Sequence, residues 1–193
     1  MRKFCRPTFI TIRTSTLGQL LPGEYYVTAR DMVLVTVLGS CVAACIRDRF
    51  NGIGGMNHFM LPGESDDLLS SSARYGACAM EKMINELIKM GARRSNLEAK
   101  LFGGGNVLHG FTVANVGERN AEFAINYLRN EKIAIVAQDM LGIYPRKVYF
   151  FPGSDKVLVK QLRNMHNDTI VEREQLYRSR IKVADVQGDV ELF

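Results

Sequence analysis

The chain has 193 residues, of which 47% are hydrophobic and 23% are charged, and its formal net charge at pH 7 is +5. This composition is typical of a soluble globular protein with one domain, and a chain of this length can bury its core without metal or disulfide support. No apolar run approaches the roughly 20 residues that span a bilayer, and polar residues interrupt any secretory signal. We therefore expect a cytoplasmic protein without membrane insertion.

The excess positive charge is concentrated at the start of the chain. Residues 1–30 hold five basic residues and one acidic residue, which account for +4 of the +5. This is a basic arm, and the remaining sequence shows no basic groove with interleaved aromatic residues. We therefore expect no nucleic-acid partner.

The four cysteines are spaced irregularly along the chain. Small secreted domains with a disulfide framework carry an even set of cysteines in a regular pattern, which is absent here. We expect Cys5, Cys41, Cys45 and Cys78 to be thiols in a reducing compartment.

The first third of the chain has the pattern of β-strands. After an N-terminal arm of residues 1–22, several segments are rich in residues that favour buried, pleated surfaces. They are residues 25–28 (YYVT), 33–39 (VLVTVLG), 41–48 (CVAACIRD) and 52–61 (GIGGMNHFML). The glycines of the last segment indicate a bulge or a close backbone approach.

Two amphipathic helices are predicted next. Within residues 71–91, apolar side chains recur at i, i+3, i+4, i+7 and i+8, which predicts one buried stripe on a helix. The stripe consists of Met80, Met83, Ile84, Leu87 and Ile88. A second helix begins near Gly117, with alanine and large aliphatic residues on one face.

The remaining strands complete the predicted fold. Residues 97–105 form a strand that enters a glycine loop, 133–141 a buried strand, and 147–162 a hairpin around Pro-Gly-Ser-Asp. We predict a layered α/β sandwich of mixed strands with two main amphipathic helices. Its domain comprises residues 23–162, and residues 163–193 form a charged tail.

A metal site is one interpretation of the cysteines and histidines. Cys41 and Cys45 form a Cys-x3-Cys pair that His58 or Cys78 would have to complete. Structural zinc sites usually have two closely spaced ligand pairs, and the second pair is missing. In an extended strand, residues four apart lie roughly 13 Å from each other, which is too far for one zinc ion. We expect no metal.

The glycine loop FGGGN, residues 102–106, allows two interpretations. It lacks the Gly-Lys-Ser/Thr ending of a phosphate-binding loop and the spacing of a dinucleotide fingerprint. We therefore interpret it as a sharp turn close to another backbone segment, which only glycine permits. A position beside an active-site cleft stays open.

Cys41 and His58 are the strongest candidates for a catalytic pair. Cys41 follows Leu-Gly-Ser, where a tight turn presents free backbone N–H groups that lower a thiol pKa and stabilise an oxyanion. His58 lies in a segment that can return antiparallel, at about the same height as Cys41. A thiol beside an imidazole is the arrangement of a Cys-His nucleophile. Burial in the core is the alternative for both residues.

Five segments, in order, carry a resemblance to a known family. TVLGSCVAACIRD, GGMNHFMLP, YGACAMEKMINELIKMGA, LEAKLFGGG and VGERNAEFAINYL together resemble the CheD family of chemoreceptor glutamine deamidases over roughly residues 23–160. The resemblance implies a compact α/β sandwich related to the catalytic domains of deamidating toxins. It also implies that Cys41 is the nucleophile, His58 its partner and Thr36 a further catalytic residue. Ser40 and Asn57 are candidates for oxyanion stabilisation or substrate positioning.

The implied reaction is hydrolysis of glutamine side chains to glutamate and ammonia through a thioester, without a metal or organic cofactor. The substrates implied are methyl-accepting chemotaxis proteins, which are long cytoplasmic helical hairpins, and family members also bind the CheC phosphatase. Two alternatives stay open: a non-catalytic adaptor for receptors or CheC, and a thiol esterase that acts on receptor glutamyl methyl esters.

Overall fold

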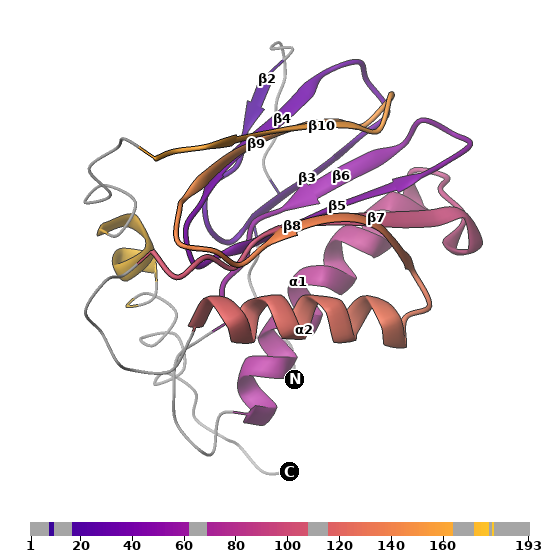
Figure 1. Ribbon diagram of the computed structural model, residues 1–193. Helices are drawn as coiled ribbons and strands as arrows, with labels where there is room; N and C mark the ends of the chain where they lie inside the picture. The colour runs from indigo at the N-terminus through magenta and orange to yellow at the C-terminus, as the bar shows by residue number, and fades with distance from the viewer. Residues whose placement is uncertain are drawn as a thin grey trace, which may run out of the picture.

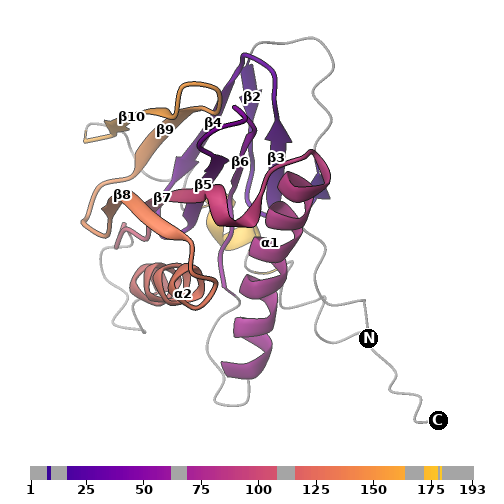
Figure 2. The ribbon, with the colours of Figure 1, turned by 90° about the vertical axis from the view of Figure 1, so that its right-hand side faces the viewer.

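The computed structural model describes residues 8–9, 17–61, 69–107, 116–163, 172–177 and 179. These residues form a mixed α/β fold of three layers, in which two long helices cover one face of a larger sheet and a smaller sheet covers the other face (Figure 1). Figure 2 shows the helices on one side and the smaller sheet on the other. No helix in the described part of the chain is long and apolar enough to cross a membrane.

Counted over the residues described, the larger sheet has six strands and the smaller one four. In spatial order the larger sheet contains β1 (Thr8–Phe9), β3 (Glu24–Thr28), β6 (Gly54–Asn57), β5 (Val42–Asp48), β7 (Leu97–Gly103) and β8 (Ala134–Met140). The smaller sheet contains β10 (Lys156–Gln161), β9 (Arg146–Phe151), β4 (Val33–Leu38) and β2 (Leu17–Gln19). The helices are α1 (Leu69–Lys89), η2 (Arg94–Asn96) and α2 (Val116–Asn130), and residues 172–177 are also helical.

The first core lies between the helices and the larger sheet. The predicted stripe of α1 enters it, since Met80, Met83, Ile84 and Leu87 are at most 1% exposed. Ile88, which the prediction included, is 38% exposed and lies outside this core. The helix therefore buries a narrower face than the spacing predicted.

The second core lies between the two sheets. Alternate residues of a strand point to opposite faces of its sheet, so β5 contributes to both cores. Val42, Ala44 and Ile46 pack toward the helices. Ala43 and Cys45 pack toward the smaller sheet, as does Cys41 just before the strand. This second core surrounds the candidate catalytic residues.

Most predicted strands are confirmed, including the hairpin of β9 and β10. The prediction that residues 133–141 form a buried strand is wrong in one respect. β8 is a strand, but it lies at the edge of its sheet, and Val136 on it is 49% exposed. An apolar run does not distinguish a central strand from an edge strand, because both favour the same residues.

Parts of residues 1–22 belong to the sheets. β1 pairs parallel with β3, and β2 pairs parallel with β4. Leu20, which follows β2, is 1% exposed and belongs to the core between the sheets. The smaller sheet thus draws on residues that precede the expected start of the domain at residue 23.

Candidate active site

The pairing of β5 with the chain after β6 brings Cys41 and His58 to one face. Val42 and Phe59 form an antiparallel bridge, with hydrogen bonds of 2.9 Å in both directions. This register places His58 opposite Ala43, so that Cys41 and His58 are diagonal neighbours and not directly opposed. Diagonal neighbours lie about 7–8 Å apart in backbone position, which long side chains bridge. The segment with His58 therefore returns antiparallel, as predicted. His58 is displaced by two residues along the strand from the position directly opposite Cys41.

His58 is held from both sheets. Its backbone N–H donates to the Glu24 carbonyl at 2.9 Å, and its carbonyl accepts from Gly23 at 2.7 Å. Its side-chain Nδ1 lies 2.7 Å from Thr36 Oγ1, which projects from β4 of the smaller sheet. Both side chains are nearly inaccessible, with exposed fractions of 2% and 1%. The imidazole therefore has one fixed orientation between the sheets.

The hydrogen bonds of Thr36 determine the tautomer of His58. The Thr36 hydroxyl donates its single proton to the Leu20 carbonyl at 2.8 Å, since a carbonyl can only accept. The hydroxyl must then accept from His58, whose Nδ1 carries the proton. Nε2 is left with a lone pair, and it has no hydrogen-bond partner among the described residues. A buried imidazole with a free Nε2 lone pair is suited to take a proton from a neighbouring thiol.

His58 is neutral in this environment. Burial lowers its pKa to about 3, the charge of Arg173 acts in the same direction, and a hydrogen bond to the Leu20 carbonyl opposes both. A neutral imidazole can act as a base, whereas an imidazolium cannot.

The turn of Gly39, Ser40 and Cys41, called the 39–41 turn below, binds a carboxylate. Oε1 of Glu174 accepts from the N–H groups of Gly39 at 3.0 Å and Cys41 at 3.2 Å. Oε2 accepts from the Ser40 N–H at 3.1 Å and from the Ser40 hydroxyl at 2.6 Å. Convergent N–H donors beside a nucleophile are the elements of an oxyanion hole.

The glycine loop after β7 shapes the 39–41 turn. Gly104 donates to the Cys41 carbonyl and Gly105 to the Gly39 carbonyl, each at 2.8 Å. Gly103 has φ +108°, and a Cβ there would lie 2.2 Å from the Cys41 carbonyl oxygen. The interpretation of the loop as a sharp turn against another backbone segment is confirmed. The N–H groups of the loop bind the carbonyls of the 39–41 turn. The N–H groups of the turn itself therefore point elsewhere and are available to an anion.

Cys41 is a buried thiol with no exposed surface. Burial raises its pKa well above the usual value, and the neighbouring Glu174 carboxylate raises it further. The thiol also hydrogen-bonds to that carboxylate. With Glu174 in place, Cys41 is therefore protonated and unreactive.

Comparison with known proteins identifies the family. The family model described as "CheD chemotactic sensory transduction" matches residues 60–161. The chain belongs to the CheD family. Relatives named "Probable chemoreceptor glutamine deamidase CheD" are 63% identical over 179 residues in Thiobacillus denitrificans and 62% identical over 179 residues in Janthinobacterium sp. (strain Marseille). These alignments cover 91% of this chain and 89% and 88% of the respective relatives.

Among solved structures, a hypothetical protein YfiH from Bacillus licheniformis aligns with a TM-score of 0.40 at 12% identity. The alignment covers 62% of this chain and 49% of that one. This likeness is too distant to relate the two folds. The expected relation of the CheD fold to deamidating toxins therefore stays a prediction.

The structure does not bring Asn57 to this CheD site. Its side chain lies on the opposite face of β6 from His58, where its Oδ1 accepts from the Ala44 N–H at 2.9 Å and its Nδ2 contacts Met80 Sδ at 3.2 Å. Adjacent residues of a strand point to opposite faces, so Asn57 and His58 cannot both face Cys41.

Cys45 and Cys78 are the remaining cysteines in the described part of the chain. Cys45 is a buried free thiol, and Cys78 is disulfide-bonded, which corrects the expectation of four thiols. Irregular sequence spacing does not reveal which cysteines meet in space. Cys5, His109 and His166 lie outside the described residues. In the described part of the chain, no group of three or more His, Cys, Asp or Glu side chains could hold a metal ion.

Asn120 is a site residue that the sequence analysis missed. Its Nδ2 donates to the Ser40 carbonyl at 2.9 Å, and its Oδ1 accepts from the Leu61 N–H at 2.9 Å. It thereby ties the 39–41 turn to the strand segment that carries His58. A signal was present, because Asn120 falls on the buried face of α2 beside Ala121. A fully buried amide on an apolar face requires hydrogen-bond partners.

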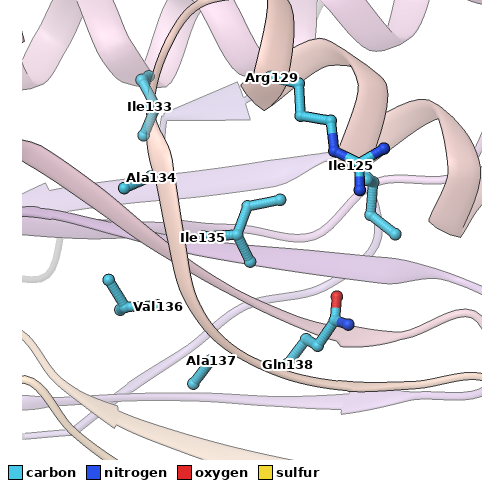
Figure 3. A pocket seen from close by; sticks show the side chains of 8 residues that line it. All are labelled: Ile125, Arg129, Ile133, Ala134, Ile135, Val136, Ala137 and Gln138. Atoms are coloured by element: carbon cyan, nitrogen blue, oxygen red, sulfur yellow. The ribbon is translucent and has the colours of Figure 1, made fainter.

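Among the hollows that the described residues line, two differ in character. One of about 510 Å³ lies between α2 and the edge strand β8, lined by Ile125, Arg129 and residues 133–138 (Figure 3). Its lining includes no thiol, imidazole or carboxylate, so it offers no nucleophile. The other, beside His58, Arg173 and Glu174, measures about 10 Å³, which is about the space of one water molecule. Among the described residues, this hollow beside His58 thus has room for no more than a water molecule.

Proposed function

We propose that this CheD chain hydrolyses glutamine side chains of chemoreceptors to glutamate and releases ammonia. The observation that carries the proposal is that His58 Nε2 has no hydrogen-bond partner among the described residues, while His58 lies on the same sheet face as Cys41 and lines a small hollow with Glu174, which binds the N–H donors of the 39–41 turn. The family relation supports the choice of substrate, because the relatives are named as probable chemoreceptor glutamine deamidases.

In the first step of this mechanism, His58 Nε2 takes the proton of the Cys41 thiol. The thiolate then attacks the amide carbon of the substrate glutamine, and the carbonyl oxygen becomes an oxyanion. The N–H groups of the 39–41 turn stabilise the charge of that oxyanion as hydrogen-bond donors. Thr36 keeps the imidazole in the tautomer that this step requires.

In the second step, the His58 imidazolium returns its proton to the amide nitrogen. The carbon–nitrogen bond breaks, ammonia leaves, and a thioester joins the substrate to Cys41. His58 then takes a proton from a water molecule, whose oxygen attacks the thioester carbon. The carbon–sulfur bond breaks, and the His58 imidazolium returns its proton to the sulfur, which yields the glutamate side chain and regenerates the thiol. The net reaction is glutamine plus water to glutamate plus ammonia.

The proposed substrates are methyl-accepting chemotaxis proteins, which present glutamines on cytoplasmic helical hairpins. The enzyme must receive a helix from the side, with the glutamine side chain directed to Cys41. A CheC-type phosphatase is a further proposed partner, and the proposed location of this chain is the cytoplasm, where the receptor hairpins lie. The new carboxylate creates a glutamate that can be methyl-esterified.

Mass spectrometry of a purified receptor cytoplasmic fragment tests the proposal. Incubation with the enzyme should add about one mass unit at specific glutamines and release ammonia, and Cys41→Ala should abolish both. His58→Ala should lower the rate by about 10²- to 10⁴-fold, the usual contribution of a general base. Cys45→Ala is the matched control. Cys45 is also a buried free thiol on the same face of the sheet, but it is not part of the 39–41 turn with its N–H donors.

The same experiment separates the alternatives. Loss of a methyl group from glutamyl esters with no change at glutamine would indicate an esterase. No mass change by the folded wild-type chain would indicate an adaptor, and undiminished turnover by Cys41→Ala would refute the nucleophile assignment.

A further inference from the structure

The carboxylate in the 39–41 turn is a glutamate side chain, which is the product of the proposed reaction. Glu174 is 5% exposed, and its two oxygens accept hydrogen bonds from Gly39, Ser40 and Cys41. It also hydrogen-bonds to the Cys41 thiol itself. A product glutamate would present the same carboxylate to the same sulfur and the same N–H donors.

The turn has a shape that accommodates this carboxylate. A Cβ on Gly39 would lie 2.7 Å from Glu174 Oε1, so any larger residue at this position would displace it. Ser40 contributes both its N–H and its hydroxyl. An anion bound by three backbone N–H groups and one hydroxyl is held by directed, charge-assisted hydrogen bonds.

The helical segment 172–177 makes these contacts through one face. Glu174 and Tyr177, three residues apart, point into the protein, whereas Glu172, Gln175 and Leu176 are exposed. The segment thus presents a glutamate from one face of a short helix. A receptor helix would present its substrate glutamine to the enzyme in the same way.

Tyr177 fixes the position of this segment. Its hydroxyl hydrogen-bonds to the hydroxyl of Tyr75 on α1. A Cβ on Gly23 would lie 2.5 Å from the Tyr177 hydroxyl, so the ring packs directly against the backbone before β3. In the described part of the chain, the segment thus contacts α1 through Tyr177 and the 39–41 turn through Glu174.

With the segment in this position, the hollow that the described residues leave beside His58 is too small for a substrate side chain. The remaining space beside His58, Arg173 and Glu174 is about 10 Å³, far less than a glutamine side chain occupies. A substrate glutamine must therefore displace Glu174 before its amide carbon can reach Cys41.

We infer that residues 172–177 are a tethered product analogue, in which Glu174 occupies the acyl-binding site and holds the enzyme closed until a receptor helix displaces it. This inference rests on the proposed function, since it identifies the occupant of the same site. The site then recognises glutamate as well as glutamine on a helix, and the receptor competes with a segment of the enzyme's own chain.

The first test compares receptor deamidation by full-length variants. If the closed form makes up about nine-tenths of the molecules, Glu174→Ala raises kcat/KM about tenfold, because the competent fraction limits the apparent affinity. Glu172→Ala, on the exposed face of the same segment, is the matched control and should leave the rate unchanged. A Glu174→Ala rate equal to or below that of the control would overturn the inference.

The second test uses the conservative variant Glu174→Gln, which turns the tethered product into a tethered substrate. The Cys41 sulfur attacks the new side-chain amide carbon at position 174, ammonia leaves with a proton from His58, and water cleaves the thioester. The side chain at position 174 thereby becomes glutamate again. Mass spectrometry of the peptide that contains this position should show a gain of about one mass unit with time, and Glu174→Gln combined with Cys41→Ala should show none.

The outcomes separate this inference from the proposed function. Receptor deamidation by Glu174→Gln without conversion of its own amide at position 174 would overturn the assignment of Glu174 to the acyl-binding site. Absence of receptor deamidation by every variant, with the chain folded, would instead refute the proposed function. Equal conversion at position 174 with and without Cys41 would indicate spontaneous deamidation and would also overturn the inference.

Discussion

Thr36 Oγ1 of the smaller sheet lies 2.7 Å from His58 Nδ1 of the larger sheet. This contact crosses the core between the two sheets and fixes the imidazole in one tautomer, because the threonine proton is already donated to Leu20. The basicity at Nε2 therefore depends on how the two sheets pack. It is a property of the fold and not of either strand alone.

Replacing Thr36 by valine tests this relationship. Valine has nearly the shape of threonine but cannot accept from Nδ1, so the tautomer with a proton on Nε2 becomes accessible. We expect kcat to fall about 10- to 100-fold, which is part of the usual contribution of a general base, with little change in KM. Thr36→Ser restores the hydroxyl and should recover most of kcat. Equal activity of the serine and valine variants would contradict the proposed role.

Replacing Asn120 by alanine tests its role as a positioning residue. The change leaves the Ser40 carbonyl and the Leu61 N–H buried without partners. We expect the free energy of unfolding to fall by about 2 kcal/mol and kcat to fall more than KM rises, because the 39–41 turn shifts. Asn126→Ala, on the exposed face of the same helix, is the control. Urea unfolding and steady-state ammonia release measure the two effects, and a kcat equal to that of the control would argue against positioning.

Replacing Gly103 by alanine tests whether the glycine loop holds the 39–41 turn in place. The new Cβ would lie 2.2 Å from the Cys41 carbonyl oxygen, at a φ of +108° that L-residues rarely adopt. We expect a loss of about 3 kcal/mol or more in stability, together with most of the activity. Gly153→Ala in the β9–β10 turn is the control, because its Cβ meets nothing within 4 Å. Similar melting temperatures for both variants would show that the turn tolerates displacement.

The stability of the protein should depend on pH through His58. Burial lowers the folded-state pKa from 6.5 to about 3. Between these values the unfolded chain binds a proton that the folded chain does not, so stability is full above pH 6.5 and falls as the pH decreases. From pH 7.5 to 5.0 this effect amounts to about 2 kcal/mol. Urea unfolding should show this loss in the wild type and less of it in His58→Gln, and equal pH dependence in the two proteins would contradict the assignment.

Local patterns were sufficient to predict much of this fold. The stripe of α1 follows from its helical spacing, and the strands around Cys41 and His58 follow from β-branched and apolar runs with short turns between them. Antiparallel return of the chain across a short connection brings these two residues together, because neighbouring segments pair readily. The glycine loop was also interpretable, since three consecutive glycines permit backbone geometry that other residues avoid.

Contacts between distant segments were not predictable in the same way. The edge position of β8 depends on which strands surround it, and an apolar run is compatible with either place. The expected charged tail contributes Glu174 to the 39–41 turn across more than 130 positions of sequence. No periodicity distinguishes this glutamate from its exposed neighbour Glu172.

The amino-acid sequence alone predicted the candidate pair of Cys41 and His58, since a thiol after a tight turn and a histidine on the returning strand are local features. Its resemblance to the CheD family predicted the kind of chemistry. Only the tertiary structure decided the hydrogen bond between His58 and Thr36, the support of the 39–41 turn by Asn120, and the position of Glu174 in that turn. The physical reason is that directed hydrogen bonds between remote segments depend on how sheets and helices pack. A receptor fragment that kept its glutamines unchanged in the presence of the folded enzyme would remove the basis of the chemical assignment.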